Sequence, residues 1–549
     1  MADPVDLIIK VRQIHAMGAN RGTYRSLAMN GERIVAISAD PDGLDGLRDS
    51  RTRVIAESGL TLLPAINDDH EHLLDASHNL SLVQPHRARS IDGLIELIRQ
   101  RAAATKPGQW LVTAAGWDES ALAESRLPTA VELDRATDAH PVLCPRGGHV
   151  CVANSLALRL AQITPDTPPP RGGTIGHDDE GRLTGLLEGS SAQLIKSLVP
   201  PVPDEERIAE LARGCRVYAS LGIGGVREAL LREGEHAVYR RAWERGLLPI
   251  RCRPMLLIDS TWPLQKCLDY IDSLEPPEPS GDDWLRTWGL KFVADGGVAG
   301  AATEEPFADD PSYTGHLNWD PNDFAAAVEF AVAQGWRVAT HAVGDRAVRT
   351  VLDAYERVVA KQPSLAPATL AIEHAMLAPA EQRTRAVRLG VAITVQHNLL
   401  YTYGREMLER WGPRRTAASL PVRSWLRDSA IVSAGSDAAH PVNPMLSLWG
   451  MVTRGTAEAG VQGPEEAIGR EQALELMTVA SVALSGELDR RGTLEPGKLA
   501  DLVAYEQDPL TAPLDDLPEL VPAVTMVGGR PVHDRHDLFQ AGRVAAGAA

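Results

Sequence analysis

Six side chains of types suited to binding divalent metals follow short apolar runs in this sequence. His70 and His72 form a His-x-His pair after the run 60–66. Side chains of an extended segment alternate, so both imidazoles should lie on one face. The other four accompany later apolar runs: Lys291, His341, His374 and Asp437. Imidazole and carboxylate groups suit zinc and neighbouring divalent metals, so the pattern predicts a metal site.

Each of these residues, taken alone, also has an ordinary structural explanation. A His-x-His pair or a histidine at a strand end is often a surface or hydrogen-bonded residue, and an aspartate after Gly435-Ser436 is often a turn or helix cap. Lys291 is either solvated or paired, or else buried with a lowered pKa and able to form a carbamate that bridges two metals. The occurrence of all six at or near the ends of predicted strands favours the metal site.

The elements that position these residues have the rhythm of repeated βα units. Eight short apolar runs, most of them preceded by a helical pattern, predict parallel strands closed into a (β/α)₈ TIM barrel. The runs are 60–66, 222–226, 248–257, 289–293, 337–341, 368–374, 391–395 and 430–435. Active-site residues of such barrels lie at the C-terminal ends of the strands, where the six side chains would converge.

Both ends of the chain are rich in predicted strands. Asn30-Gly31 predicts a hairpin turn because it accommodates positive φ angles, and Gly528-Gly529 stands between two further strand-like runs. We expect a composite β-sandwich domain from residues 1–62 and 485–549, and a barrel domain over 63–484. Residues 78–203 interrupt the barrel rhythm and predict an inserted α+β subdomain over the active site.

Composition narrows the class of protein. The 549 residues include 55 Lys and Arg against 73 Asp and Glu, a net charge of −18, which argues against a nucleic-acid binder and against docking on anionic membranes. Five scattered cysteines without a Cys-x-x-Cys pair make a disulfide framework or thiolate zinc site an unlikely design. No signal peptide or membrane span is recognisable, so we expect a cytoplasmic location.

The motifs resemble those of the amidohydrolase superfamily, and more closely its family 3, or YtcJ-like, branch, which includes N-substituted formamide deformylases. The resemblance extends over about residues 5–535 and depends on the metal-type residues together with these motifs: Trp110…Gly116-Trp117-Asp118, Gly148-His149…Asn154-Ser155, Ala294-Asp295-Gly296, His341-Ala-Val-Gly-Asp-Arg346, Ile372-Glu373-His374, Gly435-Ser436-Asp437 and the segment Gly492–Val503.

This resemblance implies a ligand set. His70, His72 and Asp437 would bind the more buried metal, and a carboxylated Lys291 would bridge to a second metal held by His341 and His374. The metal in this branch is usually zinc; one-metal and two-metal sites, and other divalent ions, stay open. The implied partner is a small-molecule substrate, and a homodimer is one possible assembly.

The mechanism expected from such a site is metal-assisted hydrolysis of a carbon–nitrogen bond in an amide, N-acyl or N-formyl compound. Asp437 would take a proton from water and deliver it to the leaving amine. His149 is either a donor to the developing oxyanion or a support for the Gly147-Gly148 turn. Asp295 and Arg346 would hold ligands or loops.

The candidate pocket residues each have two possible roles. The sequence also departs from the branch at two positions. Trp117 is either part of an aromatic pocket wall or core. Asn67 replaces an apolar residue before the His-x-His pair, and His397 stands where the family often has proline. His397, Tyr401 and Tyr403 either line the pocket or cover the barrel rim, and Asp295 is a further pocket candidate.

Three alternatives use the same scaffold. A deaminase typically has His-x-x-Glu at the fifth strand, but residues 344 and 345 are Gly and Asp here. A lactonase or phosphotriesterase would use the same six ligands. A non-catalytic scaffold protein would be expected to have lost ligands, whereas all six are present.

Overall fold

The computed structural model describes residues 5–19, 22–115, 117, 119–146, 150–170, 172–276, 282–437 and 442–539. The chain divides into two compact units, one of residues Leu74–Gly214 and one of Met1–Leu73 with Cys215–Ala549. Helices and strands both occur throughout, so the predicted α/β class is confirmed. No helix of the described part of the chain is long and apolar enough to cross a membrane.

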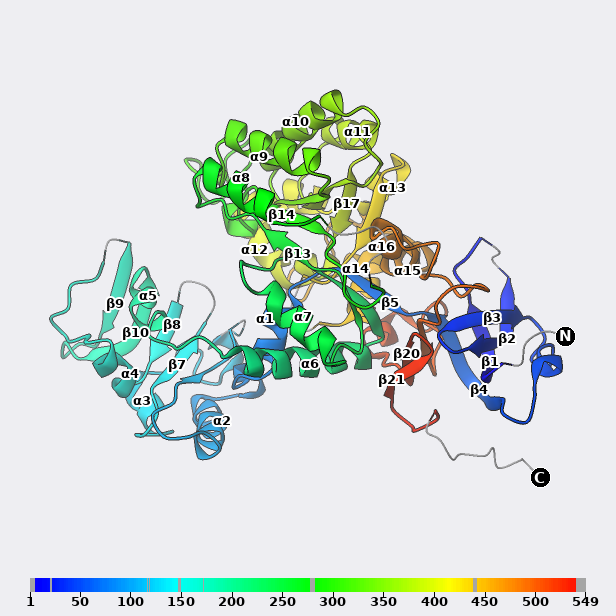
Figure 1. The fold of residues 1–549 in the computed structure, drawn as a ribbon. Coiled ribbons are helices and arrows are strands. Elements are labelled where there is room, and N and C mark those ends of the chain that lie inside the picture. Colours follow the sequence, from blue (N-terminus) through cyan, green and yellow to red (C-terminus); the bar gives the residue numbers. More distant parts are fainter. Residues whose placement is uncertain are drawn as a thin grey trace. The chain divides into compact units, whose positions relative to one another are not determined.

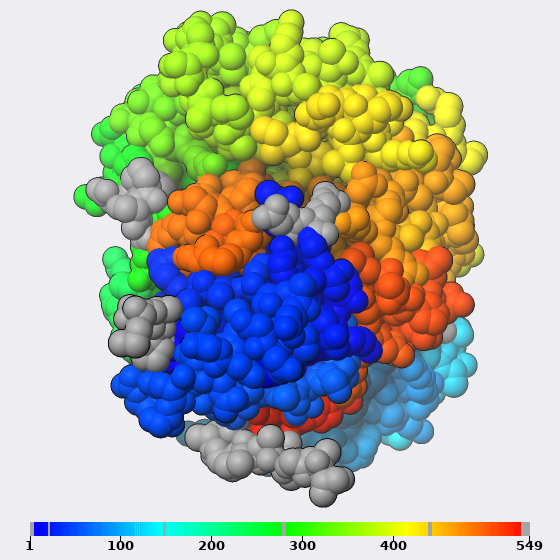
Figure 2. All heavy atoms as spheres, turned by 90° about the vertical axis from the view of Figure 1, so that its right-hand side faces the viewer, coloured from blue at the N-terminus to red at the C-terminus, as the bar shows by residue number. Residues whose placement is uncertain are grey.

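A seven-stranded sheet joins the two ends of the chain. Its strand order is β21-β20-β19-β4-β1-β2-β3. The strands are β1 (Leu7–His15), β2 (Thr23–Asn30), β3 (Arg33–Ser38), β4 (Arg53–Pro64), β19 (Leu502–Tyr505), β20 (Val524–Val527) and β21 (Arg530–Asp534). Figure 2 shows the consequence on the surface, where N-terminal residues in blue lie beside C-terminal residues in orange and red.

The predicted hairpin at Asn30-Gly31 is confirmed. Gly31 has φ +56°, and Asn30 pairs with Arg33 across the turn. Gly528 and Gly529, with φ +55° and +71°, turn β20 into β21 in the same way. Glycine has no Cβ to clash in this left-handed region, so the two Gly-containing turns set the register of their hairpins.

The first parallel strand begins later than the sequence predicts. The run 60–66 was expected to be that strand, but Leu60–Pro64 belongs to β4, where Leu63 pairs with Val503. The chain changes sheets at Ala65, whose N–H donates to the carbonyl of Asp501 at 3.0 Å, while the next N–H, of Ile66, donates to that of Gly222 at 3.0 Å. The parallel strand is therefore β5 (Ile66–Glu71), which contains His70 itself.

The strands that correspond to the predicted barrel form two parallel sheets, ordered β12-β11-β5 and β13-β14-β15-β16-β17-β18. Their bounds are β11 (Ile223–Glu228), β12 (Arg251–Cys252), β13 (Met255–Leu257), β14 (Gly289–Val293), β15 (Val338–Ala342), β16 (Leu370–His374), β17 (Ala392–Val395) and β18 (Ile431–Ala434). The third predicted run thus divides into β12 and β13 around Arg253-Pro254, where proline has no N–H for a ladder bond.

Helices separate these strands along the chain and cover them. They are α6 (Asp204–Ser220), α7 (His236–Glu244), α8 (Leu264–Ser273), α9 (Pro321–Ala333), α10 (Asp345–Lys361), α11 (Ala380–Arg388), α12 (His397–Ala418), α13 (Val422–Arg427), α14 (Pro444–Thr453), α15 (Arg470–Met477) and α16 (Val479–Leu484). Helices α9, α10 and α11 lie along one side of strands β14 and β17 in Figure 1. Helix α10 buries Val348, Val351 and Tyr355 at helical spacing, and the Tyr355 hydroxyl reaches the carbonyl of Ala371 at 2.9 Å.

The unit Leu74–Gly214 has its own sheet, ordered β6-β7-β8-β10-β9. Its strands are β6 (Leu111–Val112), β7 (Val142–Pro145), β8 (Val150–Ala153), β9 (Gly173–His177) and β10 (Leu183–Gly189). Its helices are α2 (Ile91–Ala103), α3 (Ala130–Asp134), α4 (Ser155–Leu160) and α5 (Ser191–Lys196), while α1 (Leu73–Asn79) begins at the preceding residue. Side chains cap three of these helices: Ser90, Thr129 and Asn154.

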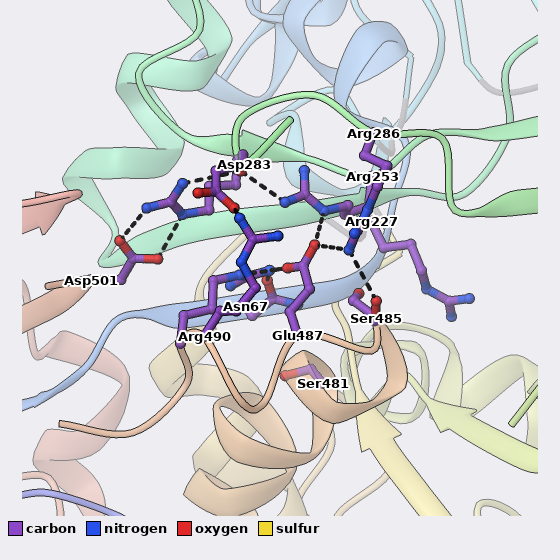
Figure 3. A network of polar contacts seen from close by, with 12 residues as sticks. Asn67, Arg227, Arg253, Asp283, Arg286, Ser481, Ser485, Glu487, Arg490 and Asp501 are labelled. Atoms are coloured by element: carbon purple, nitrogen blue, oxygen red, sulfur yellow. Dashed lines mark hydrogen bonds and ion pairs between the residues drawn. The ribbon is translucent and has the colours of Figure 1, made fainter. Parts of the chain in front are cut away.

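A buried network connects the C-terminal segment to β12 (Figure 3). Glu487 is 2% exposed and accepts hydrogen bonds from three arginines: Arg253 (2.5 Å), Arg491 (2.6 Å) and Arg286. Beside it, Arg251 donates twice to Asp501, at 2.7 and 2.8 Å. Burial raises the pKa of Glu487, but the surrounding guanidinium groups outweigh it and bring the value to about 2.

We predict that Glu487→Gln lowers the free energy of unfolding by about 3 kcal/mol at neutral pH, because it removes the charge shared by two buried arginines and the part-buried Arg286. The pKa is lowered by folding, so the stabilisation is complete above the ordinary value of 4.5 and is lost as pH falls from there towards 2. Urea unfolding followed by tryptophan fluorescence should show the gap between wild type and variant closing over that range.

The matched control is Glu458→Gln, because Glu458 is 60% exposed in its ion pair with Arg405. That control should stay within about 0.5 kcal/mol of the wild type. A Glu487→Gln protein as stable as this control would contradict the role given to the network.

Candidate metal site at the ends of the parallel strands

Three of the predicted ligand histidines come together around the carboxylate of a fourth predicted ligand, Asp437. His70 lies on β5, His72 directly follows it, His374 ends β16, and Asp437 follows β18. Asp437 Oδ1 lies 3.3 Å from His70 Nε2 and 3.2 Å from His72 Nε2. Asp437 Oδ2 lies 3.9 Å from His374 Nδ1. Ligand atoms of His70, His374 and Asp437 all fall within 4.8 Å of one another, a separation that one metal ion can bridge.

His341, on β15, extends this cluster. Its ring centroid lies 4.5 Å from that of His374, which in turn lies 4.7 Å from that of His70. His341 Nε2 also approaches the carbonyl of Gly296 at 3.2 Å and Asp295 Oδ1 at 3.5 Å. The cluster therefore contains four imidazoles, which come from β5 and the residue after it, from β15 and from β16.

Lys291 lies in the middle of β14 and is 2% exposed. Among the described residues its Nζ has no hydrogen-bond partner. Burial lowers the pKa of this amine to about 8, although the carboxylates of Glu373 and Asp437 act in the opposite direction. A buried amine that is readily neutral and unpartnered is chemically suited to react with CO₂.

The protonation states of His341, His374 and Asp437 suit metal binding, whereas His72 would have to release a proton first. Burial lowers the pKa of His341 to about 4 and that of His374 well below its usual value, so both imidazoles are neutral at pH 7. Burial raises the pKa of Asp437, but His70 and His72 outweigh it and keep the group ionised. Burial lowers the pKa of His72, but Asp437 outweighs it and raises the value to about 9. Neutral imidazole and ionised carboxylate are the forms that bind metal.

The backbone of two cluster residues is strained. His374 and the following Ala375 have φ of +76° and +43°, and Asp437 has φ +58°. Non-glycine residues in this region cost free energy and concentrate at functional sites. The N–H of Asp437 donates to the carbonyl of His70 at 2.7 Å, which fixes the strained turn against β5. This strain has no recognisable sequence signal, because it concerns residue types that normally avoid positive φ.

Buried polar residues behind the ligands were not singled out by the sequence. Glu373 accepts hydrogen bonds from His70 Nδ1, from the Thr394 hydroxyl at 2.5 Å and from Arg227 at 2.8 Å. On the other side of β5, Ser436 contacts the carboxyl groups of both Asp68 and Glu71. Charged residues within apolar strands were the available signal, since burial of a charge requires a partner.

The other predicted site residues that the structure describes have partners outside the histidine cluster. Trp117 packs in the core of the Leu74–Gly214 unit and its indole N–H donates to the carbonyl of Pro145 at 2.7 Å. His397 is 2% exposed and its Nε2 lies 3.4 Å from Arg454. The ring of Tyr401 packs edgewise on Trp449, 6.1 Å away. His149 lies outside the described residues.

Asp295 fastens the loops next to His341. Its carboxylate accepts backbone N–H groups of Ala302, Val343 and Gly344 at 2.8–2.9 Å. Arg346 donates to the carbonyls of residues 314 and 315 at 3.0 and 3.1 Å. Both residues therefore hold loop backbone in place, which is the supporting role that one of the sequence interpretations gave them.

The fold and the cluster together are typical of α/β enzymes whose ligand-binding side chains lie at the carboxyl ends of parallel strands. Residues 53–533 match the model of a family described as the amidohydrolase family. The chain belongs to the amidohydrolase family, as its motifs predicted, and is thus a hydrolase acting on carbon–nitrogen bonds.

Known relatives agree with this assignment. The chain is 29% identical to an N-substituted formamide deformylase of Arthrobacter pascens, over 95% of this chain and 97% of the relative. It is 28% identical to the putative amidohydrolase YtcJ of Bacillus subtilis (strain 168), over 88% and 91%. An uncharacterised metal-dependent hydrolase from Pyrococcus furiosus has the same fold, with a TM-score of 0.73 and 23% identity over 92% of this chain and 100% of that one.

We predict that zinc raises the melting temperature of the metal-free protein and that His374→Ala removes most of this increase, because the variant lacks one ligand of the cluster. Differential scanning fluorimetry with zinc titration measures both. His236→Ala is the matched control: His236 is a part-buried histidine, whose Nε2 contacts Thr287 at 3.3 Å outside the cluster. An equal zinc response in both variants would contradict the placement of the site.

Proposed function

We propose that the protein is a metal-dependent hydrolase that cleaves the carbon–nitrogen bond of a small amide, N-acyl or N-formyl compound. The observation that carries the proposal is the convergence of His70, His72, His374 and Asp437, with His341 beside them and the unpartnered Lys291 nearby on β14. The names of the relatives support the type of bond, and the name of the Pyrococcus protein supports the need for a metal.

We further propose that β5, β11, β12–β13 and β14–β18 form the eight-membered wall of a (β/α)₈ barrel. The contact that would close it is between the segment after β18 and β5, where Asp437 N–H donates to the His70 carbonyl and Ser436 N–H donates to Asp68 at 2.9 Å. In this arrangement the terminal seven-stranded sheet forms a composite domain, and the unit Leu74–Gly214 is an insertion after the first barrel strand.

The residues present fit one or two divalent metals, and zinc fits the donor set best. His70, His72 and Asp437 would hold one ion, and His341 and His374 a second, with Lys291 as the bridging carbamate. Such an ion lowers the pKa of water and so supplies a nucleophile at neutral pH. The Nζ of Lys291 supports a further group at the site, because it has no hydrogen-bond partner among the described residues and a buried amine without one costs free energy.

Asp437 performs the proton transfers in this mechanism. Its carboxylate takes one proton from the attacking water as the carbon–oxygen bond forms. It returns that proton to the nitrogen as the carbon–nitrogen bond breaks, which gives a carboxylic acid and an amine. The strained turn and the contacts to two imidazoles hold Asp437 in one orientation for both steps.

We predict that Asp437→Asn lowers kcat/KM by about 10²- to 10⁴-fold, because an amide cannot accept and return the proton. The assay is hydrolysis of a panel of N-formyl, N-acyl, urea and lactone compounds, with metal content measured alongside. Asp428→Asn is the control, since Asp428 pairs with Arg383 at 2.8 Å rather than with the cluster. Unchanged turnover in Asp437→Asn, or hydrolysis of lactones alone by the wild type, would contradict the proposal.

We predict that Lys291 carries a carboxyl group in the metal-loaded enzyme. Protein loaded with metal in ¹³C-bicarbonate should show a carbamate carbon signal, and Lys291→Met should lack it because no amine is available. Lys266→Met is a control with an exposed amine over the ring of Trp262. A signal of equal size in wild type and Lys291→Met would contradict this prediction.

A further inference from the structure

Arg227 is a fully buried cation on β11, the strand that pairs with β5. It lies next to the proposed metal ligands in the sheet, because Val226 pairs with Asp68 and Glu228 with Glu71. The mechanism above gives Arg227 no role. A charge with no exposed surface must be held by partners, so its contacts indicate what it does.

The contacts of Arg227 leave its guanidinium little freedom. Nε donates to the carbonyl of Asp69 at 2.7 Å, and a terminal nitrogen donates to Glu373 Oε1 at 2.8 Å. The guanidinium carbon lies 4.6 Å from the ring centre of Trp288. Two directed hydrogen bonds and this cation–π contact fix the position of the group.

Glu373 passes this constraint on to His70. Its second oxygen, Oε2, accepts from His70 Nδ1 and from the Thr394 hydroxyl at 2.5 Å. The hydrogen bond directs Nδ1 at Glu373, and the other ring nitrogen, Nε2, faces Asp437 Oδ1 at 3.3 Å. A proton held on Nδ1 leaves the lone pair of Nε2 available to a metal. Arg227, Glu373 and His70 thus form one continuous chain of hydrogen bonds from β11 through β16 to β5.

We propose that Arg227 is a positioning residue of the metal site: by fixing Glu373, it holds His70 in the tautomer and ring orientation that present Nε2 to the metal. The inference rests on the proposed function insofar as His70 is a metal ligand. Partners of this kind typically alter metal affinity about 10- to 100-fold.

A purely structural role for Arg227 makes a different prediction. In that case Arg227 would only neutralise the buried carboxylates of Asp69, which lies 3.4 Å from Nε, and Glu373. Its replacement would then lower stability without changing the affinity of the folded protein for zinc. Stability and zinc affinity must therefore be measured separately on the same variants.

The chain contains a closely matched control. Arg251 is also fully buried, donates two hydrogen bonds to one carboxylate, that of Asp501, and stacks on a tryptophan, Trp284, at 4.8 Å. Among the described residues its hydrogen bonds go to Asp501 and to the carbonyl of Asp283, and not to any of the six proposed ligands. Arg251→Lys reproduces the loss of a buried, paired and stacked guanidinium, since lysine cannot replace its two-pronged geometry.

The experiment compares Arg227→Lys, Thr394→Val and Arg251→Lys in the full-length protein. Zinc affinity is measured by competition with a chelator, and the His70 tautomer of the metal-free protein by ¹⁵N imidazole NMR. We expect zinc affinity to fall about 10- to 100-fold in Arg227→Lys and by a smaller factor in Thr394→Val. Both should show less of the Nδ1-protonated tautomer, whereas Arg251→Lys should match the wild type in both measurements.

Thr394→Val keeps the test decisive if Arg227→Lys fails to fold, because it removes one hydroxyl donor from Glu373 and leaves side-chain size nearly unchanged. It also removes the acceptor of Gln396, which contacts His374 Nδ1 at 2.7 Å, so the His70 tautomer is the deciding measurement for this variant. Wild-type zinc affinity and tautomer in the folded Arg227→Lys and Thr394→Val proteins would overturn the inference. A wild type that binds no zinc at all would instead overturn the proposed function, and the tautomer measurement would still report on Arg227.

Discussion

The site depends on one electrostatic constraint: a single ionised and part-buried carboxylate, Asp437, is surrounded by imidazoles. Four histidines and a lysine gather there, and burial opposes a positive charge on His341, His374 and Lys291. His341 and His374 are therefore neutral donors beside an ionised carboxylate, an arrangement that suits a divalent cation. The strained backbone at His374 and Asp437 is the cost of bringing these donors together.

Buried ion pairs between carboxylates and arginines support this arrangement. Behind the ligands, Glu373 is paired with Arg227, and farther along the chain Glu487 is shared by three arginines. Among the described residues arginine is the usual buried cation that pairs with buried carboxylates, and Arg227, Arg251 and Arg454 have no exposed surface. Planar guanidinium groups with several donors suit such buried pairs better than lysine, which explains their use between strands that are far apart in sequence.

Much of this could be predicted from the sequence because it depends on local patterns. Asn30-Gly31 specifies a hairpin turn by its backbone preferences, and the His-x-His spacing places two imidazoles together by strand alternation. The border between β4 and β5 could not be predicted, because it is set at Ala65 by hydrogen bonds to Asp501 and Gly222, both distant in sequence. The roles of Arg227 and Glu373 were missed for the same reason, since their meaning lies in a contact between β11 and β16.

We propose above that His70, His72 and Asp437 hold a catalytic metal. The most direct measurement is a crystal structure of the zinc-loaded protein with anomalous diffraction at the zinc edge. The account predicts a peak within about 2.0–2.2 Å of His70 Nε2, His72 and Asp437. An anomalous peak elsewhere in the molecule, with these three side chains left without metal, would contradict it.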